Sequence, residues 1–150
     1  LARAGLTVIA DSRCNIGEYT DCILKPNEVE CWRAVYNNEG YADAGYDEFI
    51  EAAKLLAKKN RSTVFCTLGK RGSAVTDGNV AEAVEAVLYK GEIDICGAGD
   101  TSLSAFSAAL AAKADFKTAA EFASLASGVT VRKIGVTGTA SPEEIEALAK

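Results

Sequence analysis

The residues best suited to chemistry lie in one short segment, residues 94–101, which reads Asp-Ile-Cys-Gly-Ala-Gly-Asp-Thr. Large apolar residues recur after it with the spacing of one helix face, at Leu103, Phe106 and Leu110. The segment therefore predicts a tight turn that opens a helix. The first N–H groups of a helix lack intrahelical acceptors and carry partial positive charge. Because small residues let an anion approach closely, the backbone of Gly97, Ala98 and Gly99 is a candidate phosphate or oxyanion cradle.

A carboxylate, Asp100, stands at the mouth of this predicted cradle. The positive field at a helix start favours its charged form, which suits a general base beside a transferring phosphoryl group. Aspartate is also a good helix N-cap. The spacing by itself leaves both interpretations open.

A second candidate pair, Asn27 and Glu30, follows a short apolar stretch and Pro26. Asparagine is a good N-cap, and a glutamate three residues later completes a capping box. The pair therefore predicts a helix start.

A third candidate is the glycine-bounded loop over residues 68–73, which follows a predicted strand. It would place backbone N–H groups and the cations of Lys70 and Arg71 at the carboxyl edge of a sheet, where α/β proteins bind ligands. The alternative is a plain hairpin turn, because a second β-prone stretch and the turn signal Asp77-Gly78 follow.

The elements that must position these residues include both strands and helices. Strands are expected over residues 6–10, as a buried parallel strand, and over 22–24, 62–67 and 83–89, the last at an edge. Helices are expected to begin at Asn27, at Tyr46 or Asp47, after Gly99, at a Thr118–Glu121 capping box and at Ser141. This order predicts a three-layer α/β/α domain, with a mainly parallel sheet and helices on both faces.

Composition restricts the class of protein. A chain of 150 residues, 49% hydrophobic and 25% charged, is ordinary for one globular domain. The formal net charge of −5 argues against a nucleic-acid partner, and no apolar run approaches a membrane span. The lack of histidine excludes Ser-His-Asp and Cys-His catalysis within this chain. Five cysteines without a C-x-x-C spacing indicate a reducing, cytoplasmic location.

The chain has no initiator methionine and no charged-then-apolar leader, and it opens with what reads as a helix end, a cap at Gly5 and a strand. We therefore expect residues 1–150 to be the C-terminal part of a longer chain. A first strand without its neighbour would present a hydrophobic edge, so a homodimer or self-association is expected.

The run Asp94 to Asp100, ahead of a helix rich in small residues, resembles the Asp-x-x-Gly-Ala-Gly-Asp signature of the ribokinase-like (PfkB-type) carbohydrate kinases. The resemblance implies ATP-dependent phosphorylation of a sugar or sugar-phosphate hydroxyl. It also implies that residues 1–150 are the C-terminal part of a kinase domain, without the N-terminal half and the lid. It also implies that the backbone from Gly97 to Gly99 forms the anion hole and that Asp100 deprotonates the acceptor hydroxyl.

The resemblance continues in other segments, in the family's order. Asn27 and Glu30 match an Asn-x-x-Glu motif that organises Mg²⁺ and its waters. The stretch Thr67, Leu68, Gly69, Lys70, Arg71, Gly72 matches a loop that lies along the nucleotide phosphates and ribose. Ser124 stands where the family often carries Asn near the adenine. The resemblance further implies a K⁺-type site formed by Asp94, the Cys96 carbonyl and carbonyls near Lys133 and Gly135.

The tail, with Lys-Ile-Gly at 133–135 and Ser-Pro-Glu-Glu at 141–144, looks similar to the heptose-phosphate kinase branch. Two other functions stay open: a noncatalytic nucleotide or sugar sensor on the same fold, and a dinucleotide-binding oxidoreductase. Asp100 argues against a sensor, which needs no base. Ser102 stands in place of the third glycine of G-x-G-x-x-G and argues against the oxidoreductase.

Overall fold

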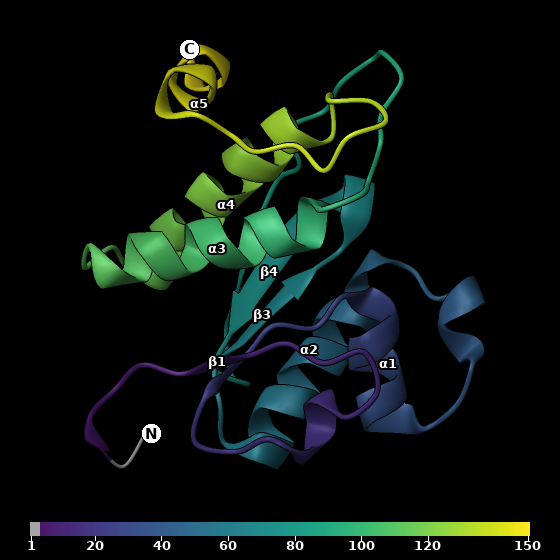
Figure 1. The fold of residues 1–150 in the computed structure, drawn as a ribbon. Coiled ribbons are helices and arrows are strands. Elements are labelled where there is room, and N and C mark those ends of the chain that lie inside the picture. The colour runs from purple at the N-terminus through teal and green to yellow at the C-terminus, as the bar shows by residue number, and fades with distance from the viewer. Residues whose placement is uncertain (1–3) are drawn as a thin grey trace. The chain divides into compact units, whose positions relative to one another are not determined.

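A five-stranded sheet with strand order β1-β2-β3-β4-β5 organises the first part of the chain (Figure 1). The computed structural model describes residues 4–150. The strands are β1 (Ile9–Ala10), β2 (Ile23–Leu24), β3 (Val64–Thr67), β4 (Ser73–Thr76) and β5 (Ala81–Val84). The pairs β1–β2 and β2–β3 are parallel, and β3–β4 is antiparallel with Thr67 opposite Ser73. The sheet is therefore mixed, with its parallel part first along the chain.

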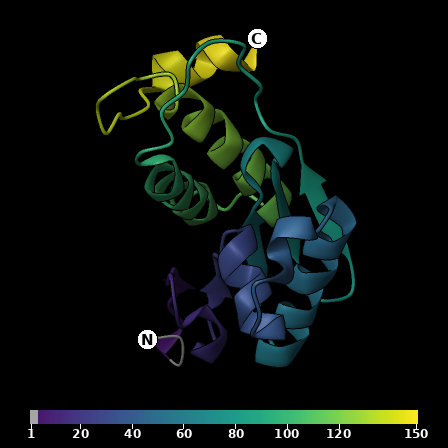
Figure 2. The same ribbon diagram turned by 90° about the vertical axis from the view of Figure 1, so that its right-hand side faces the viewer.

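Two helices, α1 (Glu28–Tyr36) and α2 (Tyr46–Asn60), run side by side and pack against β3 (Figures 1 and 2). Helix α2 begins at Tyr46 as expected, and its predicted apolar face is buried. Side chains of this face meet the strands in one hydrophobic core, which includes Leu24, Phe49, Leu56, Val64 and Cys66. Short 3₁₀ turns cover Ile16–Glu18, Gly40–Asp43 and Gly69–Arg71.

The first and last strands differ from their expected form. Strand β1 covers two residues, both only half-buried, and Leu6 before it is 57% exposed. The expected buried strand over residues 6–10 is therefore wrong in length and burial, because β1 lies at one end of the strand order. The expected edge strand over 83–89 is also displaced, since β5 ends at Val84.

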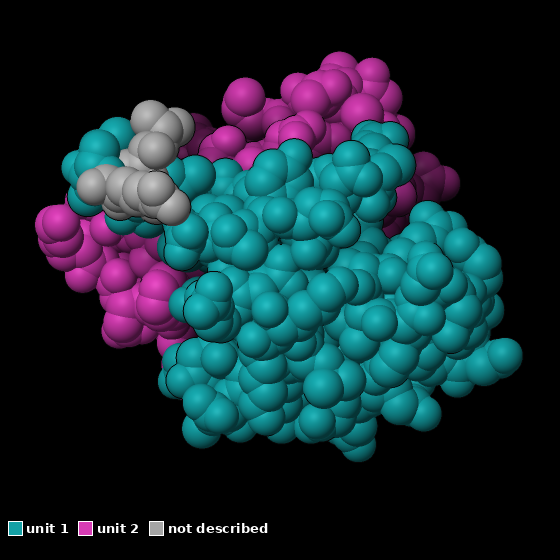
Figure 3. Space-filling model, turned by 90° about the horizontal axis from the view of Figure 1, so that it is seen from below, with its two compact units in different colours: residues 1–83 teal, residues 84–150 magenta. Residues whose placement is uncertain are grey.

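The chain divides into two compact units, residues 1–83 and 84–150, which Figure 3 colours separately. The second unit holds α3 (Ala98–Ala111), α4 (Phe116–Thr130) and α5 (Pro142–Ala149). Helices α3 and α4 pack on each other, and α5 packs on α4 (Figure 1). Small residues of α4 are buried, which fits this close packing: Ala119, Ala120, Ala123, Ala126 and Gly128. On α3, Phe106 is fully buried as expected, whereas Leu103 and Leu110 are half-buried.

Local capping sets three of the helix starts. The capping boxes predicted at Asn27 and at Ser141 are both present. The capping box predicted at Thr118 and Glu121 is wrong, because α4 begins one turn earlier. The Asp115 carboxylate accepts the Thr118 N–H at 2.8 Å and the Thr118 hydroxyl at 3.1 Å, so Asp115 is the N-cap.

Within residues 4–150, every helix falls short of the length and apolarity that crossing a bilayer requires. The helix end expected at the beginning of the chain involves residues 1–3, which lie outside the described residues.

Candidate functional site

The first candidate residues, Asn27 and Glu30, lie at the start of α1, directly after β2. The Asn27 Oδ1 accepts the Glu30 backbone N–H at 2.9 Å, and the Glu30 Oε2 accepts the Asn27 N–H at 2.8 Å. The capping interpretation is thus confirmed. Each interaction uses one lone pair of an oxygen that has two, so capping leaves acceptor capacity on both side chains.

The predicted loop from Thr67 to Gly72 lies next to this helix start. The Thr67 N–H donates to the Pro26 carbonyl at 3.0 Å, and Thr67 forms a parallel bridge with Asn27. Two segments about forty residues apart therefore meet at the carboxyl ends of β2 and β3, the edge where parallel sheets bind ligands.

The loop itself is a tight hairpin turn between β3 and β4, as the alternative interpretation predicted. Leu68 is buried, and its N–H donates to the Gly72 carbonyl at 2.8 Å. Gly69 and Gly72 have φ of +55° and +89°, a region that L side chains rarely adopt. A hairpin and a ligand-binding loop are compatible, because glycine both permits this turn and allows a ligand to approach the backbone closely.

The two cations of the loop have different surroundings. Lys70 is exposed. The Arg71 guanidinium lies 4.6 Å from the centre of the Phe49 ring and 3.6 Å from the Glu28 carboxylate. Arg71 is therefore already oriented by neighbours within the same unit, with part of its charge balanced by Glu28.

Sequence reasoning missed a partly buried ion pair at the same sheet edge. The Lys25 side chain is 5% exposed, and its Nζ lies 2.8 Å from Asp11 Oδ2. Asp11 follows β1 and Lys25 follows β2, so the pair links the carboxyl ends of two parallel strands. Polar residues placed directly after two apolar strands were the available signal.

Two thiols lie in the hydrophobic core of the first unit. Cys31 and Cys66 are fully buried, and a hydrogen bond between them together with burial raises the pKa of Cys66 well above its ordinary value. A thiol with a raised pKa is a poor nucleophile, so this pair reads as core packing.

In the second unit, the predicted turn begins α3. Gly97 is the N-cap with φ +77°, and the Thr101 N–H donates to the Gly97 carbonyl at 2.9 Å. Asp100 is the third helical residue and is exposed, so the interpretation of Asp100 as N-cap is wrong. Of the predicted cradle, the Ala98 N–H donates to the Ile95 carbonyl at 3.1 Å. The N–H groups of Gly99 and Asp100 follow in the first turn, where helix geometry offers no intrahelical acceptor.

Asp94 holds this turn together. Its Oδ1 accepts the Cys96 N–H at 2.9 Å and its Oδ2 accepts the Gly135 N–H at 3.0 Å, while its own N–H donates to the Val131 carbonyl at 2.8 Å. The N–H groups of Cys96 and then Gly135 hold the pKa of Asp94 below its ordinary value. The structure therefore brings together three of the four residues of the implied K⁺-type site. Across residues 4–150 there is no cluster of three or more His, Cys, Asp or Glu side chains that could hold a metal ion.

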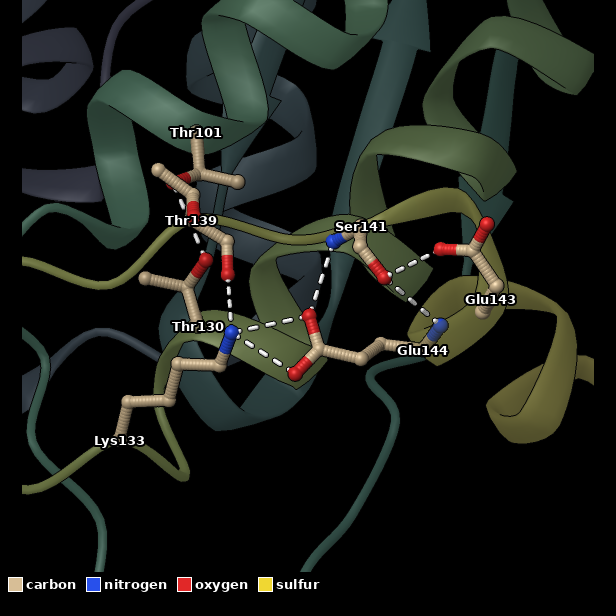
Figure 4. A network of polar contacts seen from close by, with 7 residues as sticks. All are labelled: Thr101, Thr130, Lys133, Thr139, Ser141, Glu143 and Glu144. Carbon is tan, nitrogen blue, oxygen red and sulfur yellow. Dashed lines mark hydrogen bonds and ion pairs between the residues drawn. The ribbon is translucent and has the colours of Figure 1, made fainter.

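The other two sequence-predicted residues make different contacts. The Lys133 ammonium bonds the Thr139 carbonyl and the Glu144 carboxylate (Figure 4). The Ser124 hydroxyl donates to the Glu85 carbonyl at 3.0 Å. Both side chains therefore have protein partners within the second unit.

Solved structures that match the fold of this chain include a ribokinase and a phosphofructokinase. Ribokinase of Arabidopsis thaliana complexed with ribose and ATP matches with a TM-score of 0.81 and 23% identity over 99% of this chain and 49% of that chain. Phosphofructokinase-2 of Escherichia coli in complex with potassium matches with a TM-score of 0.80 and 22% identity over 99% of this chain and 49% of that chain. The fold is thus the ribokinase-like α/β fold, as predicted.

The chain belongs to the pfkB family of carbohydrate kinases, whose model matches residues 17–144. Among its relatives, "Bifunctional protein HldE" of Shewanella baltica (strain OS185) is 33% identical over 99% of this chain, and that of Coxiella burnetii (strain RSA 493 / Nine Mile phase I) is 31% identical over 96%. The chain spans about a third of the length of these relatives, 31% and 30%.

Proposed function

We propose that this chain supplies the nucleotide site, anion hole and catalytic base of a kinase that uses ATP to phosphorylate a hydroxyl of a sugar or sugar phosphate. Membership of the pfkB family supports the reaction class. The observation that carries the assignment is the start of α3: Gly97 takes the cap position in a left-handed conformation, and Asp100 is left exposed on the first turn.

In this proposal Asp100 accepts the proton of the acceptor hydroxyl, whose oxygen forms a bond to the γ-phosphorus of ATP. The bond from that phosphorus to the β–γ bridging oxygen breaks, and ADP leaves. The backbone of the Gly97–Gly99 turn would face the negative charge of the transferring phosphoryl group and would donate through N–H groups that lack an intrahelical acceptor, such as that of Gly99. Preorganised donors of this kind contribute about 10²–10³-fold in enzymes that use them.

The segments of the first unit are assigned to the nucleotide and its metal. We infer that the Thr67–Gly72 loop binds the nucleotide through its backbone and Lys70. Asn27 and Glu30 fit a role beside Mg²⁺ through water, because the capping box fixes both side chains and leaves them acceptor capacity. Bound Mg²⁺ would neutralise phosphate charge. In the second unit, Ser124 is assigned to the adenine.

The acceptor that we propose is a heptose phosphate, on the resemblance of residues 133–144 to that branch of the family. We also propose that the protein works in the cytoplasm, which the five free thiols support: Cys14, Cys22, Cys31, Cys66 and Cys96.

The first test is phosphoryl transfer by the intact protein against a panel of sugars and sugar phosphates that includes heptose phosphates. ADP release should depend on one class of acceptor and should stop when Mg²⁺ is chelated. A protein that binds ATP but releases no ADP with any acceptor would be a sensor, and one that prefers NAD would be an oxidoreductase.

The 150-residue chain alone should bind ATP weakly and phosphorylate no sugar at a useful rate. It spans 49% of the solved ribokinase, so we expect the groups that position an acceptor to lie in the rest of such a protein. Calorimetry with ATP tests the weak binding, and the same panel of sugars and sugar phosphates tests for phosphorylation. Light scattering tests for self-association through the edge strand β1. Robust turnover by the chain alone would show that the acceptor site has been misplaced.

A monovalent cation should raise the activity of the intact protein, with K⁺ more effective than Na⁺ or tetramethylammonium. The proposed ligands are the Asp94 carboxylate and carbonyls of Cys96, Lys133 and Gly135. Asp94, Cys96 and Gly135 already share hydrogen bonds, so a cation there would brace the turn before α3. Equal activity in the three salts would remove the monovalent site from the proposal.

A further inference from the structure

Residues 133–139 form a loop within the connection between α4 and α5, and one side chain joins the two ends of this loop. The Lys133 Nζ donates to the carbonyl of Thr139 at the far end of this 133–139 loop. It also lies 2.8 Å from Glu144 Oε1 and 2.9 Å from Glu144 Oε2, in α5 (Figure 4). One ammonium group thus joins both ends of the loop and the helix that follows.

The fit around the Lys133 stem is close. A Cβ built on Gly138 would lie 2.8 Å from Lys133 Cδ and 3.0 Å from Lys133 Cβ. Glycine at 138 is therefore what lets the stem pass across the loop. Glu144 has a second task, because its Oε2 accepts the Ser141 N–H at 2.8 Å in the capping box of α5. The loop and the helix cap share one carboxylate.

The middle of the 133–139 loop lies against the turn that begins α3. The Gly135 N–H donates to Asp94 Oδ2. The Thr137 Cγ2 would stand 2.8 Å from a Cβ on Gly97, and the Thr137 hydroxyl lies 3.7 Å from the Cys96 thiol. Asp94, Cys96 and Gly97 of the turn therefore each lie against Gly135 or Thr137 of the loop.

We propose that the Lys133 side chain is a positioning residue for the proposed phosphoryl transfer. The contacts of its ammonium with Thr139 and Glu144, here called the Lys133 clip, hold the 133–139 loop closed. The closed loop in turn holds Asp94 and Gly97, so that the first turn of α3 presents its N–H groups and Asp100. The expected effect on turnover rests on the proposed function, whereas the closure of the loop by the Lys133 clip does not.

The expected effects on stability and on rate distinguish a positioning role of Lys133 from a purely stabilising one. The Lys133 and Glu144 side chains are 30% and 42% exposed, and ion pairs that water reaches contribute about 0–1 kcal/mol to stability. Displacement of a catalytic group by about 1 Å, in contrast, can cost about 10²-fold in rate. Loss of the clip should therefore affect turnover more than folding.

The test is Lys133→Met in the intact protein, which keeps most of the stem against Gly138 and removes the charge. Hydrogen exchange should show loss of protection at the amides of Gly135 and Cys96, with the buried amides of α4 unchanged. Turnover should fall by up to about 10²-fold, with a smaller change in KM for ATP.

A matched control is Lys117→Met, which removes an exposed ion pair to Glu121, 3.8 Å apart, elsewhere in the same unit. It should leave exchange at Gly135 and Cys96, and turnover, as in the wild type. If Lys133→Met fails to fold, Glu144→Gln serves instead, because its amide oxygen still accepts the Ser141 N–H. It should shift exchange and turnover in the same direction by less.

Unchanged hydrogen exchange at the Gly135 and Cys96 amides in Lys133→Met would show that Lys133 does not hold the loop closed. Faster exchange with unchanged turnover would overturn the positioning role. A wild-type protein without kinase activity would refute the proposed function, and hydrogen exchange would still decide whether Lys133 closes the loop.

Discussion

Asp100→Asn in the intact protein is expected to lower turnover by about 10²–10⁴-fold, the usual contribution of general base catalysis. The amide keeps the size of the side chain but cannot accept the hydroxyl proton. Affinity for ATP should change little, because the proposed nucleotide contacts come from other residues. Steady-state kinetics with calorimetry of nucleotide binding measure the two effects separately.

Stability provides the internal control for this prediction. A carboxylate in the first turn of a helix contributes about 0.3–1 kcal/mol, so Asp100→Asn should lower the melting temperature only slightly. Glu121→Gln removes an exposed carboxylate of α4, and it should leave turnover intact. Near-wild-type turnover in Asp100→Asn would exclude Asp100 as the base.

Gly97→Ala should also reduce turnover strongly, by about 10²–10³-fold if the anion-binding amides are displaced. Gly97 has φ +77°, and a Cβ there would stand 2.8 Å from Thr137 Cγ2. Either Thr137 or the start of α3 must therefore move. Kinetics of the purified variant, with a melting curve, measure the consequence.

Gly135→Ala is a matched control, because it introduces the same backbone strain at a positive φ without a steric clash of the new Cβ. Its φ is +72°, and no atom lies within 4 Å of a Cβ built there. Both alanines pay about 1–2 kcal/mol for a left-handed conformation. Gly97→Ala should lose far more turnover, and Thr137→Ser, which removes the Cγ2 methyl, should restore part of it. Equal losses in the two alanine variants would mean that strain alone is responsible.

The features that sequence could predict are local ones. The capping box of Asn27 and Glu30 and that of Ser141 and Glu144 involve residues three apart, so their side-chain chemistry determines the helix start. The burial of Phe49 and Leu56 in α2 follows from the helical period in the same way. The Asp94–Asp100 segment also predicted its own turn and helix, since glycines and small residues allow few alternatives.

The long-range contacts could not be predicted. Asp94 and Gly135 are 41 positions apart, and nothing in either neighbourhood indicates that one bonds the other. Contacts over a shorter range also escaped prediction: the family resemblance implies a role for the Lys133 carbonyl, whereas the Lys133 ammonium closes a loop through contacts at Thr139 and Glu144. The half-burial of β1 depends on its place in the strand order, which its apolar composition does not encode.

The capping box at α1 has a consequence for ligand binding. Free glutamate and asparagine side chains sample several rotamers, and ordering one long side chain costs up to about 2 kcal/mol of entropy. In Asn27 and Glu30 this entropy is already lost on folding, since each side chain holds the other's backbone N–H. A metal-bound water arriving at these oxygens would meet groups that need no further ordering. If Asn27 and Glu30 have the proposed role beside Mg²⁺, folding and affinity depend on the same rotamers, and substitution at either position should change both.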